Sequence, residues 1–206
     1  MKTTIFWFRR DLRLEDNTAL YEALCQGKNV LPLFIFDEDI LNELPKDDAR
    51  VQFIYQSLDR INQKLLQHNS SLLILKGTPE AIWPKLISSY EIESVYVNKD
   101  YEPYAIKRDL DLKQLLLDHG VEFHAFKDQV IHEESEVMKA DGTPYTVFTP
   151  YKNKWLSLYK PTALKAEIGF ENFSSKQHTF PSMESLGFIK SNIMVKDYDL
   201  KVLDNS

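Results

Sequence analysis

The sequence predicts an α/β fold in which helices cover both faces of a doubly wound, five-stranded parallel sheet. Five short, predominantly apolar runs of strand length alternate with four segments of helical periodicity. Strands that are buried on both faces are typical of parallel sheets, because the crossover helices cover both sides. The runs are 3–8, 30–36, 71–75, 94–97 and 121–125.

Each helical segment between these runs carries a start or stop signal. In 47–68, apolar residues recur at alternating spacings of three and four, which is the period of an amphipathic helix. Segment 18–25 follows a candidate N-cap at Asp16 or Asn17 and ends at Gly27, a candidate C-terminal glycine. Segments 79–90 and 103–118 begin with proline, which suits the first turn because its missing N–H is not needed there.

The order of the strands follows from general rules of connection. Right-handed crossovers and the usual doubly wound arrangement give the order 3-2-1-4-5, with the switch point between the first and fourth strands. After residue 126 the pattern changes to an irregular arm, a short aromatic and lysine-rich helix within 149–160, and a stretch without periodicity. We therefore expect an α/β domain at 1–130 and an arm and interdomain linker at 131–206.

The composition limits the class of protein. The 206 residues are 43% hydrophobic and 27% charged, which suits a soluble domain with one core. The single cysteine excludes a disulfide framework and a cysteine-based zinc site, and it suits a reducing cytoplasm. The sequence has neither a cleavable signal nor an apolar run long enough to span a membrane. A net charge of -6 is unlike that of a domain that binds DNA on its own.

Polar and aromatic side chains follow the central strands of the predicted sheet, beside the switch point. Ligands of open α/β sheets bind outside the carboxyl ends of the strands. A cleft with carboxylates, arginines and flat aromatic walls suits a planar, hydrogen-bonding ring better than a bare phosphate. The candidates are Arg9, Arg10 and Asp11 after the first strand, Asp37 after the second, Arg50 and Phe53 on the next helix, and Asn98, Asp100, Tyr101, Glu102 and Tyr104 after the fourth.

The motifs of common nucleotide enzymes are missing from the sequence. Its six glycines (27, 77, 120, 142, 169 and 187) are isolated, so neither GxGxxG nor a Walker A loop is possible. No serine lies in a GxSxG motif, and no nucleophile with its base can be nominated. His119, His124 and His132 lack metal-ligand spacing. The residues alone therefore indicate a binding domain, with neither a catalytic set nor a metal site.

Several candidates also have a purely structural interpretation. Arg10, Asp11 and Arg13 could form an ion-pair cluster with Glu15 or Asp16 that fixes the first loop. Asp37 could cap a short turn, and Glu102 supplies the negative charge that is favoured at a helix N-terminus.

Three further features also have a structural interpretation. Core positions are expected for Trp7 and Cys25. The tyrosines and lysines of 151–160 could simply cover an edge of the sheet.

Six ordered stretches carry a family resemblance: "WFRRDLRLEDN" (7–17), "FIFDEDIL" (34–41), "DARVQFIYQSL" (48–58), "VNKDYEPYAIKRD" (97–109), "GTPYTVFTPYKNKW" (142–155) and "FPSMESLGF" (180–188). They resemble the N-terminal part of the DNA photolyase/cryptochrome family, in particular of class I cyclobutane pyrimidine dimer photolyases. The resemblance extends over essentially the whole chain.

The resemblance implies a Rossmann-like domain that binds an antenna chromophore and passes light energy to FAD in a separate helical domain. In such photolyases, the excited FAD splits cyclobutane pyrimidine dimers in UV-damaged DNA. This sequence lacks the residues of the FAD domain, so we expect the chain alone neither to bind FAD catalytically nor to repair DNA. The resemblance further implies a cytoplasmic, monomeric protein whose partners are that FAD domain and, through the full-length protein, damaged DNA.

The resemblance also bears on which antenna is bound. Folate-binding members carry an Asn-Glu pair where this sequence has Tyr104 and Ala105. The motif "DYEPY" is more similar to members that bind 8-hydroxy-5-deazaflavin or FMN, which favours these over methenyltetrahydrofolate. Carried over by position, the implied antenna-binding residues are Arg9, Arg10, Ile35, Phe36, Asp37, Arg50, Phe53, Asp100, Glu102 and Tyr104.

Two other functions remain open. The same motifs occur in cryptochromes, light-signalling flavoproteins whose distinguishing residues lie outside this chain. A stand-alone nucleotide-binding module is less favoured, since it would require a glycine-rich phosphate loop.

Overall fold

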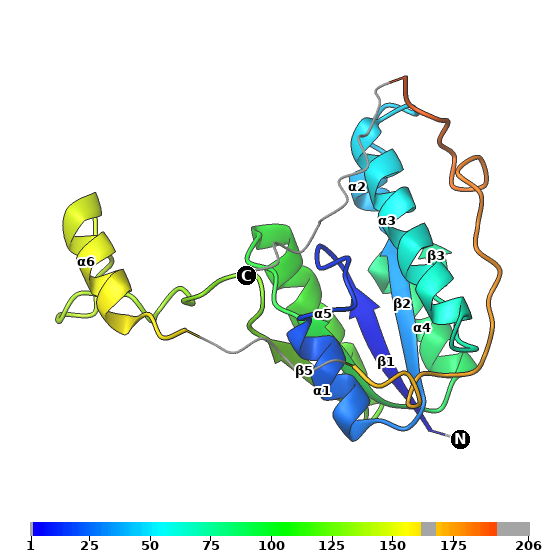
Figure 1. The fold of residues 1–206 in the computed structure, drawn as a ribbon, viewed down its shortest axis with the longest axis horizontal. Coiled ribbons are helices and arrows are strands. Elements are labelled where there is room, and N and C mark those ends of the chain that lie inside the picture. Colours follow the sequence, from blue (N-terminus) through cyan, green and yellow to red (C-terminus); the bar gives the residue numbers. More distant parts are fainter. Residues whose placement is uncertain (1, 162–167, 193–206) are drawn as a thin grey trace, which may run out of the picture.

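A computed structural model describes residues 2–161 and 168–192 of the chain. Five parallel strands form one sheet in the order β3-β2-β1-β4-β5 (Figure 1). This confirms the predicted fold class and strand order. Strand boundaries differ from the predicted ones by up to two residues. The strands are β1 (Thr3–Phe8), β2 (Val30–Phe36), β3 (Leu73–Lys76), β4 (Ile92–Asn98) and β5 (Glu122–Phe126).

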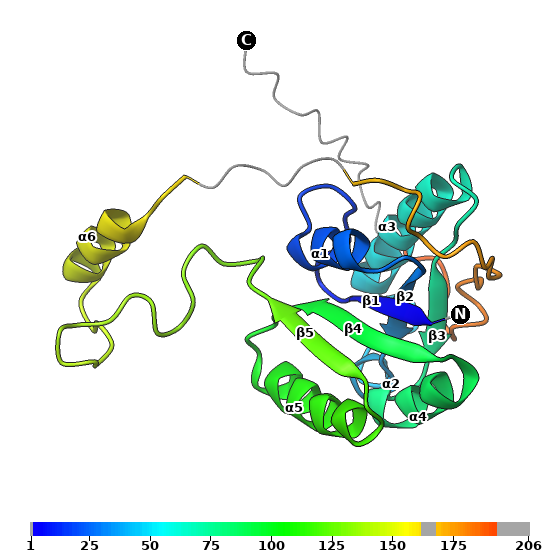
Figure 2. The same cartoon turned by 90° about the horizontal axis from the view of Figure 1, so that it is seen from below.

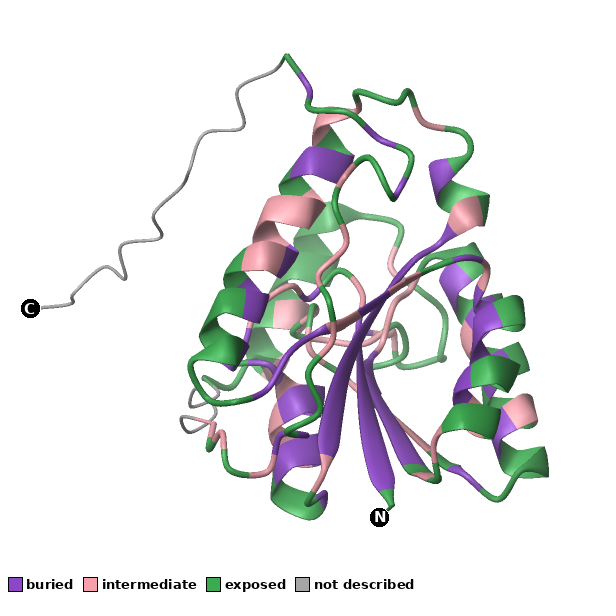
Figure 3. Ribbon diagram, turned by 90° about the vertical axis from the view of Figure 1, so that its right-hand side faces the viewer, coloured by how far each residue is buried: buried purple, intermediate pink, exposed green. Residues whose placement is uncertain are grey.

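Helices cover both faces of the sheet. In Figure 2, α1 and α3 lie on one side of the strands and α4 and α5 lie on the other. The buried colour of Figure 3 is continuous along the central strands, whereas the outer surfaces of the helices are exposed. The helices are α1 (Thr18–Gln26), α2 (Glu38–Leu41), α3 (Ala49–Leu66), α4 (Pro79–Ser89), α5 (Pro103–Asp118) and α6 (Phe148–Leu158).

Side chains of β1 alternate between two hydrophobic clusters, one on each face of the sheet. Phe6 and Phe8 pack with α1 and α3, while Ile5 and Trp7 pack with α4 and α5. Trp7 is 2% exposed, and its ring meets Trp83 edge-on at 5.4 Å between centroids. The predicted core position of Trp7 is confirmed, and burial on both faces explains why β1 has no polar alternation.

Asn17 caps α1, since its side chain accepts a hydrogen bond from the Leu20 N–H. The helix ends at Gly27 as predicted, but the reason differs. Gly27 has an extended φ of -94° instead of the left-handed φ of a usual terminal glycine. Glycine is needed there because a Cβ would lie 2.8 Å from Thr4 Oγ1 on β1. The expected burial of Cys25 was wrong, because its side chain is exposed on the outer surface of α1.

Gly27→Ala is expected to lower the free energy of unfolding by about 1–3 kcal/mol, the usual cost of overpacking a tight contact. The added methyl group pushes α1 away from Thr4, where the two elements meet. Urea unfolding followed by circular dichroism measures this. Cys25→Ala, two residues earlier and exposed, is the control and should change stability by less than about 0.5 kcal/mol. Equal stability of the two variants would contradict the close approach of Gly27 to Thr4.

The arm after β5 leads to α6, which lies apart from the sheet in both Figure 1 and Figure 2. A helix was predicted here, but the idea that its tyrosines and lysines cover the sheet edge was wrong. No residue of α6 is buried, and its recorded contacts include an edge-on packing of Trp155 against His132 of the arm. The arm itself is tied to the domain by ion pairs of Lys99 with Glu133 and of Lys127 with Glu136.

Residues 168–192, which we call the strap, run over the domain beside α3 (Figure 1). Backbone hydrogen bonds of 2.8 Å join Val30 at the start of β2 to Asn172 and Ser174. Tyr55 of α3 donates to the Pro181 carbonyl at 3.0 Å. Phe173, Leu186 and Phe188 are buried in the same cluster as β1 and α3. Within the predicted 131–206 linker, this part therefore contributes to the core of the α/β domain.

Candidate functional site

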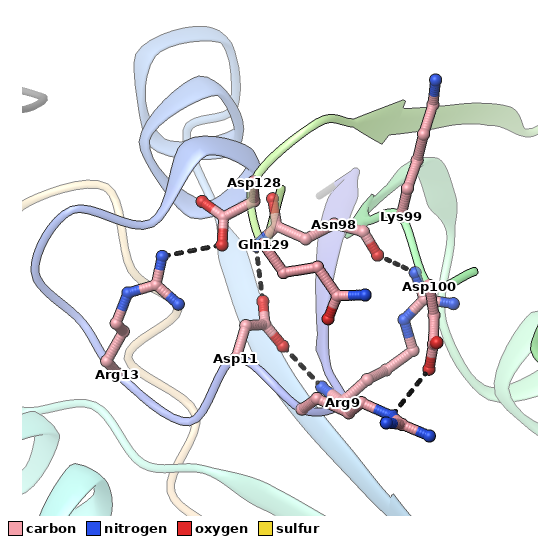
Figure 4. A pocket seen from close by; sticks show the side chains of 9 residues that line it. Arg9, Asp11, Arg13, Asn98, Lys99, Asp100, Asp128 and Gln129 are labelled. Atoms are coloured by element: carbon pink, nitrogen blue, oxygen red, sulfur yellow. Dashed lines mark hydrogen bonds and ion pairs between the residues drawn. The ribbon is translucent and has the colours of Figure 1, made fainter. Parts of the chain in front are cut away.

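A charged crevice lies at the switch point, outside the carboxyl ends of β1 and β4 (Figure 4). Its volume is about 60 Å³, well below the roughly 300–1,000 Å³ typical of pockets for drug-sized ligands. It is lined by Arg9, Arg10, Asp11, Arg13, Asn98, Lys99, Asp100, Asp128 and Gln129. The predicted polar cluster thus exists, but most of its charged groups already bind one another.

Asp11 holds the first loop in place. Its carboxylate accepts hydrogen bonds from the Arg9 backbone N–H at 2.8 Å and from the Asn98 side chain at 2.6 Å. Arg13 reaches Asp128, beyond β5, at 2.7 Å (Figure 4). Both residues therefore fasten the loop between β1 and α1 to the carboxyl end of β4 and to the segment after β5. The predicted role in fixing the loop is confirmed, with Asn98 and Asp128 as the recorded partners, whereas Glu15 pairs with Lys64.

The two arginines after β1 have different environments. The Arg9 side chain is 6% exposed, donates to Asp109 at 2.5–2.6 Å and also donates to the Asn98 carbonyl. Burial lowers the pKa of Arg9, while Asp109 acts in the opposite sense. Arg10 is 62% exposed and pairs with Asp100 at 3.1 Å and with Glu102 at 3.7 Å. Arg9 is therefore a structural cation beneath the crevice, and Arg10 lies at its rim.

Asp37 and Tyr104 meet across the carboxyl end of β1. The Tyr104 hydroxyl, on the first turn of α5, donates to Asp37 Oδ2 at 2.6 Å. The other oxygen of Asp37 caps α2 by accepting from the Asp39 N–H at 3.1 Å. Burial raises the pKa of both side chains, and for Tyr104 the hydrogen bond and the negative charge of Asp37 add to the effect. Asp37 is thus both a helix cap, as one interpretation predicted, and part of a polar group at the carboxyl edge of the sheet, although neither Asp37 nor Tyr104 lines the crevice.

Arg108 completes this group and was not a candidate from the sequence. Its guanidinium lies 4.8 Å from the ring centre of Trp7 and 5.9 Å from that of Tyr104. Asp109 fixes it through hydrogen bonds from Nε and Nη2 at 3.1 and 3.0 Å. Its positive charge also acts on Asp37. The signal in the sequence was the spacing of four between Tyr104 and Arg108, which places both on one side of a helix.

The remaining predicted site residues lie elsewhere. Ile35 and Phe36 are 5% and 2% exposed and belong to clusters on opposite faces of the sheet. Arg50 binds Asp48 at 2.7 Å and lines a separate hollow of about 390 Å³ that includes the end of the strap. Phe53 is 49% exposed on α3. The structure thus records no contact that brings Arg50 or Phe53 to Asp37 within the residues it describes.

A larger hollow borders the crevice and is lined by residues of α5, of β5 and of the arm. Its volume is about 520 Å³ and it shares Lys99 and Asp100 with the crevice. Ile106, Leu110 and Phe123 supply apolar wall. Together the two concavities offer ring-sized space next to the Arg10–Asp100 pair.

Residues 2–161 and 168–192 contain neither a candidate metal site nor a membrane-spanning helix. Among them, histidine, cysteine and carboxylate side chains form no cluster that could hold a metal ion. No helix in the same ranges is long and apolar enough to cross a membrane.

The fold and the site define a doubly wound α/β domain with a polar carboxyl edge and no glycine-rich phosphate loop. A family profile described as DNA photolyase matches residues 4–168, most of the chain. The chain therefore belongs to the DNA photolyase family.

Individual relatives agree with this assignment. A deoxyribodipyrimidine photo-lyase of Synechococcus sp. is 33% identical over 193 residues, covering 89% of this chain and 40% of that protein. Cryptochrome-1 of Spalax judaei is 26% identical, covering 89% and 33%. The crystal structure of an archaeal photolyase from Sulfolobus tokodaii, described with two FAD molecules, aligns with a TM-score of 0.77 at 27% identity, covering 93% and 43%. The chain spans less than half the length of these relatives.

Proposed function

We propose that this chain is the antenna-chromophore-binding domain of a DNA photolyase that repairs UV-induced cyclobutane pyrimidine dimers with light and FAD. The observation that carries the proposal is the polar group of Asp37, Tyr104 and Arg108 at the carboxyl edge of the sheet. The Arg10–Asp100 pair lies at the same edge, after β1 and β4. These residues offer donors, acceptors and an aromatic surface to a flat ring, without a phosphate loop.

The chromophore in this proposal is 8-hydroxy-5-deazaflavin or an FMN-like flavin. The Sulfolobus tokodaii photolyase, described as implying a novel light-harvesting cofactor, holds two FAD molecules. Ala105 is 2% exposed, so the position that carries glutamate in folate-binding members is buried and apolar here. That environment disfavours methenyltetrahydrofolate, because a buried position without a carboxylate cannot hold its polar groups.

Repair itself belongs to a larger protein in this proposal. The chain covers only part of the length of its relatives. We assign FAD binding, dimer splitting and contact with damaged DNA to a helical domain in the remaining part. That domain is the proposed partner, the complete protein is a cytoplasmic monomer, and the chain alone is inactive. A light-dependent repair assay on the isolated chain should give no product.

A signalling role is the second candidate, supported by the match to Cryptochrome-1 of Spalax judaei. Both functions use a similar α/β domain, so the antenna site does not separate them. A dimer-repair assay on the complete protein distinguishes the two, since a cryptochrome would show no repair.

Fluorescence titration of the purified chain with FMN and with 8-hydroxy-5-deazaflavin tests the antenna proposal. Binding should quench or shift the ligand emission, and Asp100→Ala should weaken it about tenfold, the usual effect of losing a charge-assisted hydrogen bond. Asp111→Ala is the control, because this α5 carboxylate is exposed and pairs only locally with Lys107. Flat titrations with both ligands would refute the proposal.

A further inference from the structure

We propose that the outer edge of β5 binds an extended peptide segment of a partner protein, which adds to the sheet as a further strand beside α5. The segment carries, at alternate positions from its N-terminus, one basic, two apolar and one acidic side chain. Strand addition to an exposed sheet edge is a general mode of peptide recognition, in which the main chain supplies affinity and alternate side chains supply specificity.

β5 is an edge strand whose outer side is open. Within residues 2–161 and 168–192, β4 is the only strand that pairs with it. Figure 2 shows β5 outermost in the sheet, with α5 alongside. At the opposite edge the strap supplies cover, since Ser71, just before β3, donates to the Lys176 carbonyl at 3.4 Å and accepts from the His178 N–H at 2.7 Å. One edge of the sheet is therefore covered and the other is available.

Two residues of β5 direct their backbone N–H and C=O groups outward. The Lys99 N–H donates to the Phe126 carbonyl at 2.8 Å, so Phe126 bonds toward β4. Bonding residues alternate along a strand, so His124 also bonds toward β4, whereas Phe123 and Ala125 turn their backbone groups to the open side. Among the described residues, no recorded hydrogen bond uses these groups. A row of unpaired backbone groups is a template for another strand.

The usual protections of an edge strand are missing from β5. Such protections include proline, bulges and inward-pointing charges. The register with β4 is unbroken from Glu122 to Phe126, and the run EFHAF contains no proline. Its polar residues, Glu122 and His124, alternate with Phe123 and Ala125 and therefore point to the other face. The face toward α5 thus leaves the edge suitable for pairing.

The hollow of about 520 Å³ extends this edge sideways to α5, and Phe123 and Ala125 line it. Ile106 and Leu110, one turn apart on α5, form its apolar wall and are 41% and 63% exposed. Side chains of an added strand alternate between the two faces of the sheet, so every second one meets this wall. The hollow therefore favours a peptide with apolar residues at two alternate positions.

Two charges in the lining of the hollow have no ion-pair partner among the described residues, Glu134 and Lys113. Glu134 lies on the arm next to Glu133, which pairs with Lys99 after β4, so it is near the carboxyl end of β5. Lys113 lies further along α5, which runs back from that end. An antiparallel strand, the slightly more stable pairing per residue, starts near Glu134 and ends near Lys113. Charge complementarity therefore places the basic residue of the peptide first and the acidic residue last.

The probe is a capped heptapeptide, Lys-Thr-Val-Thr-Val-Thr-Glu, titrated into the purified, isotope-labelled chain and followed by heteronuclear NMR. Binding should shift the backbone amides of Phe123 and Ala125 in a saturable manner. In an antiparallel pair the valine N–H groups face β5 and the threonine N–H groups face away. N-methylation of both valines should therefore weaken binding at least about tenfold, whereas N-methylation of the two threonines that precede them should leave it within about twofold.

Variants of the chain test each wall of the site. Ala125→Pro removes an outward N–H and should weaken the peptide several-fold, because proline is tolerated where an edge N–H faces away from the sheet. Leu110→Ala should also weaken it. Leu117→Ala is the matched control, since Leu117 is 67% exposed on α5 outside the hollow, and it should leave binding unchanged.

A peptide with its lysine and glutamate exchanged has the same composition and tests the charges. It should bind about threefold more weakly to the unaltered chain, the usual size of exposed charge effects. This preference should disappear in Lys113→Glu, because both ends of the hollow are then acidic.

Three outcomes would overturn the inference. The first is the absence of saturable shifts at Phe123 and Ala125, or equal binding of the two N-methylated peptides. The second is a shift of the same amides with protein concentration alone, which would assign the edge to a second copy of the chain. The third is loss of peptide binding in the complete protein, which would place the rest of that protein on the edge. The methylated peptides are compared on the unaltered chain, so that result does not depend on whether any variant folds.

Discussion

Asp109→Ala is expected to lower the free energy of unfolding by about 3–5 kcal/mol, the usual cost of removing one partner from a buried ion pair. Asp109 accepts hydrogen bonds from both Arg9 and Arg108, whose side chains are only 6% and 9% exposed. Without the carboxylate, two guanidinium groups remain buried near the Trp7 ring and repel each other. Urea unfolding followed by tryptophan fluorescence and circular dichroism measures the loss.

The control for Asp109→Ala lies two residues further along the same helix. Asp111 forms an exposed pair with Lys107 at spacing four, and such pairs contribute at most about 0.5 kcal/mol. Both variants exchange an aspartate of α5 for alanine, so their helix propensities change equally. If Asp109→Ala lowered the free energy of unfolding no more than Asp111→Ala does, the buried charges of Arg9 and Arg108 would not depend on Asp109 for neutralisation.

The arrangement of the sheet could be predicted because its central strands β1 and β2 are buried on both faces. Unbroken apolar runs such as Thr3–Phe8 distinguish parallel strands from the half-exposed strands of an antiparallel sheet. The handedness of the crossovers then leaves few possible orders. Helix starts at Pro79 and Pro103 were predicted to the residue, because proline fits the first turn and little else in a helix.

The site could be predicted only in part, because its contacts cross between elements. The end of a strand is visible in the sequence, so Asp37 and Asp100 were expected at the carboxyl edge. Arg108 and Asp109 lie inside a helix, where charged residues usually face solvent. That Arg108 is buried and Asp109 only partly exposed follows from how α5 packs beside β1 and Trp7. The spacing of four residues could predict that Tyr104 and Arg108 lie on one side of a helix. It could not predict that either of them lies near Asp37.

The strap was missed for a different reason. Segments without helical or strand periodicity give no pattern from which burial can be read. In residues 168–192 the apolar side chains are scattered, yet Phe173, Leu186 and Phe188 each reach the core. Phe173 lies in a parallel bridge with Val30, and the adjoining backbone bonds extend the pairing of β2. An irregular segment can therefore be integral to a domain whose sequence pattern ends before it.

Phe173→Ala is accordingly expected to destabilise the domain by about 3–5 kcal/mol, the range for deleting a buried phenyl ring. Phe173 is 7% exposed and contacts Phe170 in the cluster formed by β1, α1 and α3. Phe148→Ala is a matched control, since Phe148 is 74% exposed at the start of α6 and should change stability by less than about 0.5 kcal/mol. Urea unfolding of the two variants measures the difference. If the strap were only a linker, Phe173→Ala and Phe148→Ala would lower the free energy of unfolding by equal, small amounts. Removing the phenyl ring of Phe173 would then leave the core intact.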